Sequence, residues 1–534
     1  MTQYAKILNP IHTPQSKPLP GREAEMARNP AGGYGFSVSD WTRLTRFLMI
    51  GTEGGTYYED ARALTLENAN ALIACMSADG ARVVGEIVRI SDGGLAPKNS
   101  PALFALALCI ARGDAVTRAA ALEALPRVCR IATHLFELLE AYQTLDGGWG
   151  RAVRRAVGGW YTSRTPETLA YQLVKYRSRH RWTHRDALRV AHPKPADSTT
   201  ETILGWAAGK RAIEDADGSP LIWAFQRAQT IVYPADLIRL IVDYHLPREA
   251  IPDRWLDRAD VWAALLHDMP ITALIRTLNR LTTVGLLTPF SAAMAQVTDR
   301  LTDGETLRRG RVHPLALLLA GKTYAAGRGV LGSLTWEPLP QIVTALDAAF
   351  EASFVNVVPL DKRILIAVDT SGSMSGHGSV AGVVGLTPLQ AAAAAAVCYL
   401  RTQTDAHIIG FDTQVRELGA LAGSTMSGLL HRLETWRGGG TDAAIPLDYA
   451  LKHNLTIDAL LMLTDSMSWS GAPHPAIAMQ RLRQKTGVAV RWVMVQTTAT
   501  GTQLSDPQDV DAMEMAGFSP DLFMVANAFF RREL

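Results

Sequence analysis

The sequence predicts a multidomain protein in which a long all-α part is followed by an α/β doubly wound domain. Its 534 residues exceed what one ordinary hydrophobic core organises. From about residue 38 to about residue 350, apolar residues recur at three- and four-residue spacing, as on helices. After about residue 355, short apolar runs alternate with helical stretches, which is typical of an α/β domain.

The first part is expected to consist of many short helices. Segments such as PALFALALCIARG and IPDRWLDRADVWAALLHDMP have helical periodicity and are separated by Gly, Pro or Asp-Gly. A long all-α chain of this kind favours helix pairs stacked as a solenoid. The sequence shows no clean period, so this interpretation rests on helix density alone. Residues 1–32 are Pro-rich, and we expect them to form a mobile or surface-draped arm.

The second part is expected to contain a parallel sheet covered on both faces. The runs ILIAVD, HIIGFD, ALLMLTD and VRWVMVQT alternate with helical stretches such as LQAAAAAAVCYLRTQ. Ligands of such sheets bind beyond the carboxyl ends of the strands. Asp369 and Asp465 each end one of these runs. We therefore expect functional groups to gather at that edge.

Composition excludes several classes of protein. The hydrophobic fraction of 48% and the charged fraction of 19% are typical of a well-packed globular protein. No segment approaches the run of roughly 18 apolar residues that a membrane helix needs. The start, MTQYAKILNP, lacks the pattern of a secretory signal. The four cysteines form no CxxC pair, which argues against zinc knuckles and a disulfide framework. We expect a cytoplasmic protein without a membrane span.

Oxygen-bearing side chains follow two of the predicted strands. Asp369, Ser371 and Ser373 form D-x-S-x-S, Thr441 follows three glycines in GGGTD, and Asp465 ends LMLTD. Two carboxylates and three hydroxyls, without sulfur or imidazole, suit Mg²⁺ first, and also Mn²⁺ or Ca²⁺, rather than zinc. The first motif alone would equally suit a strand-to-helix turn in which Ser and Thr cap the helix. Such a set can also persist as a structural hydrogen-bond hub without metal.

The helical part contains one dense basic segment, KYRSRHRWTHRDALRVAHPKP, at residues 175–195. It holds seven Lys or Arg, three His and a single acid. We expect Lys175 and Arg179, four residues apart, to share one helix face, and Arg185 and Arg189 to repeat this spacing on the next helix. Such density predicts binding to the phosphates of RNA or DNA. A solvated cationic face, or arginines paired with acids elsewhere, would explain the segment equally well.

Long stretches of the chain resemble a known family. The TROVE module of the Ro autoantigen family is resembled by three segments: RFLMIGTEGGTYYEDARALTLENANALI, GWGRAVRRAVGGWY and the basic segment. We expect the chain to be a bacterial member of that family. The three oxygen-bearing loops, taken in order, resemble the metal-ion-dependent adhesion site of von Willebrand factor A domains. The resemblance implies a HEAT-like helical-repeat ring, at residues 33–355, closed by a von Willebrand factor A domain at residues 356–534.

The resemblance also implies functions. Ro proteins bind small noncoding Y RNAs on the outer surface of the ring and admit the single-stranded 3′ ends of misfolded RNAs through its central hole. Bacterial members are linked to exoribonucleases tethered through Y RNA. The RNA-contacting positions of the family fall here on Lys175, Arg179 and His192. Its metal motif is matched at Asp369, Ser371, Ser373, Thr441 and Asp465.

We therefore expect a non-enzymatic RNA-binding scaffold for noncoding-RNA quality control, with a divalent cation as its cofactor. The alternative is a metal-dependent protein-binding module, in which a partner's carboxylate completes the coordination and the helical part is a passive frame. A third hypothesis, a metal-dependent hydrolase, is disfavoured because nucleases gather several carboxylates around two metals. The basic segment favours the scaffold, since an adhesion protein has no need for it.

Overall fold

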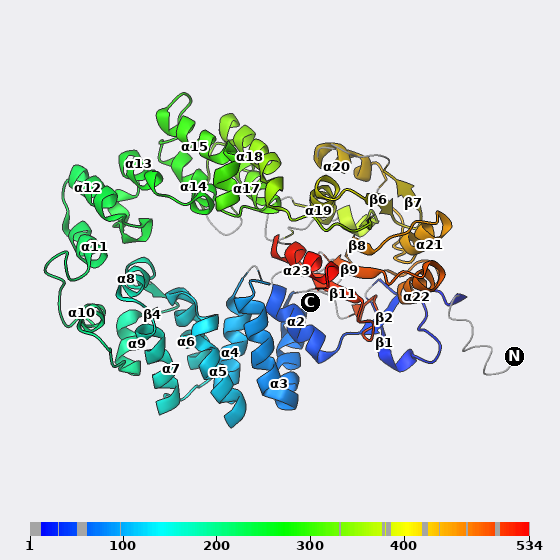
Figure 1. Ribbon diagram of the computed structural model, residues 1–534, viewed down its shortest axis with the longest axis horizontal. Coiled ribbons are helices and arrows are strands. Elements are labelled where there is room, and N and C mark those ends of the chain that lie inside the picture. The colour runs from blue at the N-terminus through cyan, green and yellow to red at the C-terminus, as the bar shows by residue number, and fades with distance from the viewer. Residues whose placement is uncertain are drawn as a thin grey trace. The chain divides into compact units, whose positions relative to one another are not determined.

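The computed structural model describes most of the chain. The described residues are 12–29, 31–50, 61–96, 98–329, 333–375, 380, 386–418, 426–436, 438–465, 468–496, 502–518 and 520–532. The chain forms two compact units (Figure 1). The helical unit contains Phe47–Gly51 and Ala71–Asp299, and the α/β unit contains Met1–Arg46, Thr52–Asn70 and Arg300–Leu534. Each is considered by itself below.

The helical unit is built from short helices that follow one another closely. Those that lie wholly within it are α4 (Ser100–Arg112), α5 (Ala115–Val128), α6 (Ala132–Thr144), α7 (Arg151–Thr162), α8 (Pro166–Lys175), α9 (His184–Ala191), α10 (Ser198–Ala207), α11 (Pro220–Thr230), α12 (Pro234–Tyr244), α13 (Ala259–His267) and α14 (Ile271–Thr283). Helices α2 (Asp40–Ile50), α3 (Ala61–Asp92) and α15 (Ala292–Thr302) have residues in both units.

Successive helices stack on one another. Helix α4 packs on both α5 and α6, α5 packs on α7, and α8 packs on α10 (Figure 1). A helix in such a stack must bury more than one stripe, and α4 is accordingly buried along most of its length. The predicted all-α stack is confirmed. In the part of the chain that the structure describes, no helix is both long and apolar enough to cross a membrane.

The basic segment contains a β-hairpin between two helices. Strand β3 (Ser178–Arg179) pairs antiparallel with β4 (Trp182–Thr183). The two residues between them, His180 and Arg181, have φ angles of +50° and +61°. Two successive left-handed residues are what a two-residue hairpin turn of type I′ requires. The chain therefore reverses direction at His180 and Arg181 instead of continuing as a helix.

The hairpin corrects one prediction. Lys175 is the last residue of α8 and Arg179 lies in β3, so the prediction that they share a helix face is wrong. The physical reason is that four-residue spacing of charges does not by itself form a helix, and the turn ends α8. Arg185 and Arg189 do lie on one helix, α9, and both are exposed. The Thr183 side chain caps that helix.

A six-stranded sheet forms the centre of the α/β unit. Its strand order is β11-β9-β8-β5-β6-β7, and only the pair β6 and β7 is antiparallel. The strands are β5 (Ile364–Asp369), β6 (Ala406–Phe411), β7 (Val415–Glu417), β8 (Ala459–Thr464), β9 (Arg491–Gln496) and β11 (Ala512–Ala516). The four predicted runs are β5, β6, β8 and β9. The expected parallel sheet is observed for these four strands, and the additional edge strand β7 is antiparallel because a connection of three residues from β6 can only form a hairpin.

Helices cover both faces of this sheet. Every residue of β5 and β8 is buried, and successive strand residues point to opposite faces. Residues of α21 and α22 form one core with alternate residues of β5 and β8, while α19 packs on β5, β6 and β8 and α23 on β9. The helices of this unit are α16 (Gly304–Arg309), α17 (Pro314–Ala325), α18 (Pro340–Ala352), α19 (Pro388–Thr402), α20 (Met426–Glu434), α21 (Ile445–Lys452), α22 (Pro475–Thr486) and α23 (Pro520–Phe530).

The N-terminal segment, defined here as residues 12–37 without Pro30, packs within the α/β unit. Its strand β1 (Met26–Arg28) pairs with β2 (Tyr34–Ser37), which pairs in turn with β10 (Thr502–Gln503). One hydrophobic cluster joins the segment to α22 and consists of Leu19, Met26, Phe36 and Ala476. The expected mobile or surface-draped arm is therefore a packed segment over residues 12–29, and residues 1–11 lie outside the described residues.

Candidate metal centre and nucleic-acid interface

Asp369 ends β5 at the carboxyl edge of the sheet, and its side chain is completely buried. The backbone N–H of Ser371 donates to Asp369 Oδ1 at 2.8 Å, and the hydroxyl of Thr464 donates to Oδ2 at 2.6 Å. The hydroxyl oxygens of Ser371 and Ser373 lie 3.2 Å apart. The structure thus brings the three residues of D-x-S-x-S together in the turn after β5.

Asp465 directly follows β8, which pairs with β5, and it is also buried. Burial, and secondly the negative charge of Asp465, raise the pKa of Asp369 to about 7. The two carboxylates at the sheet edge therefore repel each other when both are ionised.

The glycine loop brings Thr441 to the same edge. The N–H of Gly438 donates to the carbonyl of Thr370 at 3.2 Å, and the N–H of Asp442 donates to the carbonyl of Asp412 at 2.9 Å. Gly438 has a φ angle of +138°, which a residue with a side chain rarely adopts. Thr441 itself is buried. The loop lies against the ends of β5 and β6.

Two further aspartates at this edge were not singled out from the sequence. Asp412 follows β6, is buried, and accepts from the N–H of Gln414 at 2.8 Å and from Arg416 at 3.0 Å. Its signal was available, because HIIGFD ends in aspartate as ILIAVD does. Asp442 follows Thr441, and burial raises its pKa to about 6. It accepts from the N–H of Ala444 at 3.0 Å.

These residues fit a hard divalent cation. Every donor is an oxygen, and a cation would relieve the repulsion between the buried carboxylates of Asp369 and Asp465. Within the described residues, no three His, Cys, Asp or Glu side chains gather around a possible metal position, so hydroxyls are needed to complete the ligand set. Ser371, Ser373 and Thr441 would supply them. The ion would provide a positive charge at the sheet edge that could attract an oxygen ligand from water or a partner.

Lys175 is held in place at the end of α8. Its Nζ donates to the hydroxyl of Tyr171 at 2.8 Å and lies 5.0 Å and 5.5 Å from the ring centres of Tyr171 and Tyr176. Arg179 and His192 are exposed, and His192 ends α9 with a φ angle of +46°. Within the described residues, no hydrogen bond or ion pair joins Lys175, Arg179 and His192 to one another, so they form separate points on a surface rather than one cluster.

These residues belong to a larger group of basic side chains, called the basic surface here. It comprises α7, the end of α8, the hairpin, α9 and the residues just beyond, and α7 packs on α9. None of its members forms an ion pair among the described residues, although His180 in the hairpin turn lies 2.7 Å from Glu140. The alternative that these arginines pair with acids elsewhere is therefore disfavoured. The basic surface consists of Arg151, Arg154, Arg155, Lys175, Arg177, Arg179, Arg181, Arg185, Arg189, His192 and Lys194.

A cavity of about 280 Å³ opens beside Lys175. One side comes from the end of α8 and the start of the hairpin, and the other from residues 248–256. The lining residues are Lys175, Arg177, Ser178, Arg248, Glu249, Ile251, Pro252, Asp253 and Leu256.

The sequence and the fold match known proteins over nearly their full length. Residues 27–217 and 239–326 match the model of the TROVE domain, and residues 363–530 match that of the Ro60 vWA domain. The chain belongs to the Ro60 family. Its predicted fold class, a helical TROVE part plus a von Willebrand factor A domain, is thereby confirmed.

Two curated relatives and one solved structure of the Ro60 family show the extent of the likeness. The chain is 38% identical over 537 residues to the RNA-binding protein RO60 of Deinococcus radiodurans, which covers 100% of both proteins. It is 30% identical over 580 residues to the RNA-binding protein RO60 of Caenorhabditis elegans, covering 94% of this chain and 89% of that protein. The crystal structure of the Deinococcus radiodurans Ro (RSR) protein matches with a TM-score of 0.76 and 37% identity, covering 93% of this chain and 100% of the other.

Proposed function

We propose that this Ro60-family protein is an RNA-binding scaffold that holds structured RNA without cutting it. The observation that carries the proposal is the basic surface, whose exposed cations have no ion-pair partner among the described residues. Each such cation can replace a counterion on the phosphate backbone, which drives binding through counterion release. The names of the relatives support this proposal, since both are RNA-binding proteins.

The RNA proposed is a small noncoding Y-like RNA, and the residues proposed to contact it are Lys175, Arg179 and His192. The aromatic rings around Lys175 hold its ammonium group before RNA arrives, so little side-chain freedom is lost on binding. Arg179 on β3 and His192 after α9 present donors to neighbouring phosphates or 2′-hydroxyls. Misfolded RNAs with free 3′ ends are the second proposed ligand. An exoribonuclease is the proposed protein partner, and the cytoplasm is the proposed location.

Replacement of Lys175 and Arg179 by Ala tests the RNA surface. The double variant should bind a Y-like RNA more weakly at physiological salt, and the slope of log K against log salt should flatten by about one unit per lost contact. Arg239→Ala is the matched control, because Arg239 is 78% exposed on α12, away from the basic segment in sequence. An unchanged affinity and slope in a correctly folded double variant would refute the assignment.

A second candidate function is metal-dependent binding of a protein partner at the von Willebrand factor A domain. The observation that favours it is Trp469, which is 43% exposed and whose ring lies against Gly440 in the loop of Thr441. Exposed tryptophan beside a metal position suits a docking surface, in which a carboxylate of the partner completes the coordination. We propose Mg²⁺ as the resident ion, with Mn²⁺ or Ca²⁺ as substitutes.

A further inference from the structure

The side chain of Gln15 lies buried among loops that are far away in sequence. Its Nε2 donates to Asp442 Oδ1 at 2.6 Å, across 427 residues of sequence, and to the carbonyl of Pro473 at 3.2 Å. Its Oε1 accepts from the hydroxyl of Ser468. Its backbone N–H donates to the carbonyl of Gly471 at 2.9 Å. Both polar atoms of this side chain thus join the loop that contains Asp442 to the segment that contains Ser468 and Pro473.

The residues that Gln15 contacts are those that adjoin the candidate metal ligands. Ser468 Oγ accepts from the N–H of Ala443 at 3.0 Å and lies 3.2 Å from the carbonyl of Thr441. Asp442 is the neighbour of Thr441, and Ser468 lies three positions after Asp465. Asn29, in the same N-terminal segment, donates to the carbonyl of Ser468 at 2.8 Å. The loop of Thr441, between α20 and α21, and the segment after β8 are therefore tied together by a third piece of chain.

We propose that the N-terminal segment is part of the metal centre, with Gln15 as the positioning residue that fixes the loops of Thr441 and Asp465 relative to each other. This inference rests on the metal proposed above. A buried amide whose donors and acceptor are all engaged has one favourable arrangement, since any loop shift leaves a polar atom unpaired. A metal site gains affinity when its ligands are held in place before the ion binds.

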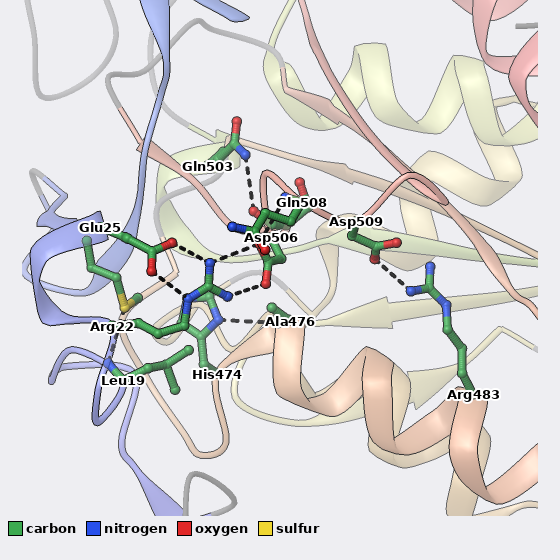
Figure 2. Close-up of polar contacts among 12 residues, drawn as sticks. Leu19, Arg22, Glu25, His474, Ala476, Arg483, Gln503, Asp506, Gln508 and Asp509 are labelled. Atoms are coloured by element: carbon green, nitrogen blue, oxygen red, sulfur yellow. Dashed lines mark hydrogen bonds and ion pairs between the residues drawn. The ribbon is translucent and has the colours of Figure 1, made fainter. Parts of the chain in front are cut away.

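The same segment has a second anchor that does not touch these loops. Arg22 lies between the carboxylates of Glu25 and Asp506, with Nε 3.1 Å from Glu25 Oε1 and Nη2 3.1 Å from Asp506 Oδ1 (Figure 2). Arg22 also lies over the ring of Phe36 at 4.5 Å. Its loss would loosen the segment without removing a contact to Asp442 or Ser468, which makes it a matched control.

The test compares Gln15→Met with Arg22→Met in the full chain. Methionine keeps the volume of glutamine but removes its amide. In Gln15→Met, amide hydrogen exchange over residues 441–444 and 468–471 should accelerate about tenfold, as the loss of one or two buried hydrogen bonds predicts. The Kd for Mn²⁺, measured by calorimetry below the unfolding temperature, should rise by about the same factor. Arg22→Met should lower the unfolding temperature but leave both measurements at the wild-type value.

The outcomes separate this inference from the metal proposal. Wild-type exchange rates in Gln15→Met would overturn the inference whether or not metal binds. Faster exchange with an unchanged Kd would overturn it too, since the loops would then be tied for another purpose. If wild-type protein binds no Mn²⁺ at all, the metal proposal fails together with the positioning role. Equal losses in both variants would show general destabilisation, which also contradicts a specific role for Gln15.

An independent observation concerns the cavity beside Lys175. Three cations on its wall are each held by an aromatic ring: Lys175 by Tyr171, Arg177 by Phe225 at 5.1 Å, and Arg248 by Trp262 at 5.9 Å. None of the three forms an ion pair among the described residues. They face one small volume, so their charges add there. An anionic ligand is what such an arrangement attracts.

The cavity also carries two carboxylates, from Glu249 and Asp253. A cavity lined by both positively and negatively charged side chains suits a ligand that combines a phosphate with an edge of hydrogen-bond donors. We infer that the cavity takes one unpaired guanosine nucleotide of the bound RNA, with its phosphate toward Arg177 and Arg248 and its base toward Glu249. Guanine presents two adjacent donors, N1–H and the N2 amino group, which match the two oxygens of a carboxylate, whereas uracil presents one. This inference rests on the proposed RNA function.

Methyl groups in the cavity allow a direct test with GMP, UMP, guanosine and inorganic phosphate as probes. Ile251 and Leu256 line the cavity, so their ¹³C-labelled methyl signals report on its occupancy. GMP should shift them saturably and bind more tightly than UMP, guanosine or phosphate. Arg248→Ala should weaken GMP about tenfold, and Glu249→Gln should bring GMP and UMP to equal affinity. Arg239→Ala should change nothing.

Two results would overturn the nucleotide inference. One is the absence of a saturable shift with GMP, and the other is equal affinity for GMP and UMP in the wild type. RNA titrations tell its failure from that of the proposed function. If the Lys175 and Arg179 double variant loses RNA while Arg248→Ala and Glu249→Gln do not, RNA binding stands and the nucleotide pocket falls. If none of these variants changes RNA affinity, both proposals fall.

Discussion

Two buried carboxylates, Asp369 and Asp465, decide what the carboxyl edge of the sheet can do. Burial, and secondly the charge of Asp465, raise the pKa of Asp369, so two ionised carboxylates are unfavourable here without a cation. The proposed cation would offset both charges. The hydroxyls around them add ligand oxygens without adding charge.

Asp369→Asn should separate these two states. The substitution keeps the shape of the side chain and removes one charge, so we expect Mg²⁺ and Mn²⁺ binding to be lost. The metal-free variant should unfold within about 1 kcal/mol of the wild type, because a repulsive buried pair is relieved. Calorimetric titration and thermal unfolding with and without metal measure both effects. An unfolding temperature that still rises with Mn²⁺ in the variant would show that the ion binds elsewhere.

A buried histidine makes the stability of the helical unit depend on pH. His184 is buried beside the Phe136 ring, with its Nδ1 3.0 Å from the hydroxyl of Tyr161. Burial lowers its pKa to about 4 from 6.5. The depressed pKa means that stability is complete above pH 6.5. The free energy of unfolding should fall by roughly 1.4 kcal/mol per pH unit as the pH drops from about 6.5 to about 4.

His184→Gln should reduce the slope of the unfolding free energy against pH by about 1.4 kcal/mol per pH unit, which corresponds to one proton. Chemical unfolding at a series of pH values gives the slope, and other buried histidines will keep part of it. A slope in His184→Gln equal to that of the wild type would contradict the assignment.

At the scale of elements, the fully buried strands were the easiest to predict. ILIAVD, HIIGFD, ALLMLTD and VRWVMVQT became β5, β6, β8 and β9, because strands covered on both faces are continuous apolar runs. The edge strands β7 and β11 were not predicted, since VRE and AMEMA are too short and too mixed to stand out from loops. A buried strand can be recognised from its apolar residues, whereas an edge strand is defined by its hydrogen bonds to the adjacent strand, which the local sequence does not reveal.

The β-hairpin and the N-terminal segment were missed for different reasons. The charges of residues 175–189 recur at helical spacing, but the chain reverses at His180 and Arg181 without the Asn or Gly that usually mark such a turn. The contacts of Gln15 join positions 427 residues apart, and no local pattern records them. By contrast, the position of the candidate metal residues at the sheet edge could be predicted, because Asp369, Ser371 and Ser373 lie at or just after the end of a predicted strand, Asp465 ends another predicted run, and Thr441 follows a glycine run.

Arg181→Gly should have opposite effects on stability and on RNA binding. Arg181 has a φ angle of +61° in the turn of the hairpin, which glycine adopts without strain. The free energy of unfolding should therefore rise by about 0.5–1 kcal/mol. RNA affinity should fall, because one cation leaves the basic surface. Urea unfolding and RNA titration measure the two effects, and a variant that is less stable than the wild type would contradict the turn assignment.

At the scale of the whole molecule, the two units carry different chemistry on one chain. The helical unit holds the basic surface, and the α/β unit holds the candidate metal centre. Phosphate attraction alone does not distinguish one RNA from another, so selection requires a feature of RNA shape. We propose that this feature is a free single-stranded 3′ end, because its unpaired bases can stack on a protein surface whereas those of a duplex cannot.

An RNA with a free single-stranded 3′ tail should therefore bind more tightly than the same stem with a blunt end. The stem would contact the basic surface in both, and the tail would add contacts of its own. Stacking contributes about 1–3 kcal/mol per base, so a preference of about tenfold or more is expected. Both RNAs are titrated at several salt concentrations with Mg²⁺ present, and their lengths are checked by electrophoresis afterwards. Equal affinities would contradict recognition of the tail. Shortened RNA that appears only with Mg²⁺, and not with Asp369→Asn, would contradict a scaffold without catalysis and place hydrolysis at the sheet edge.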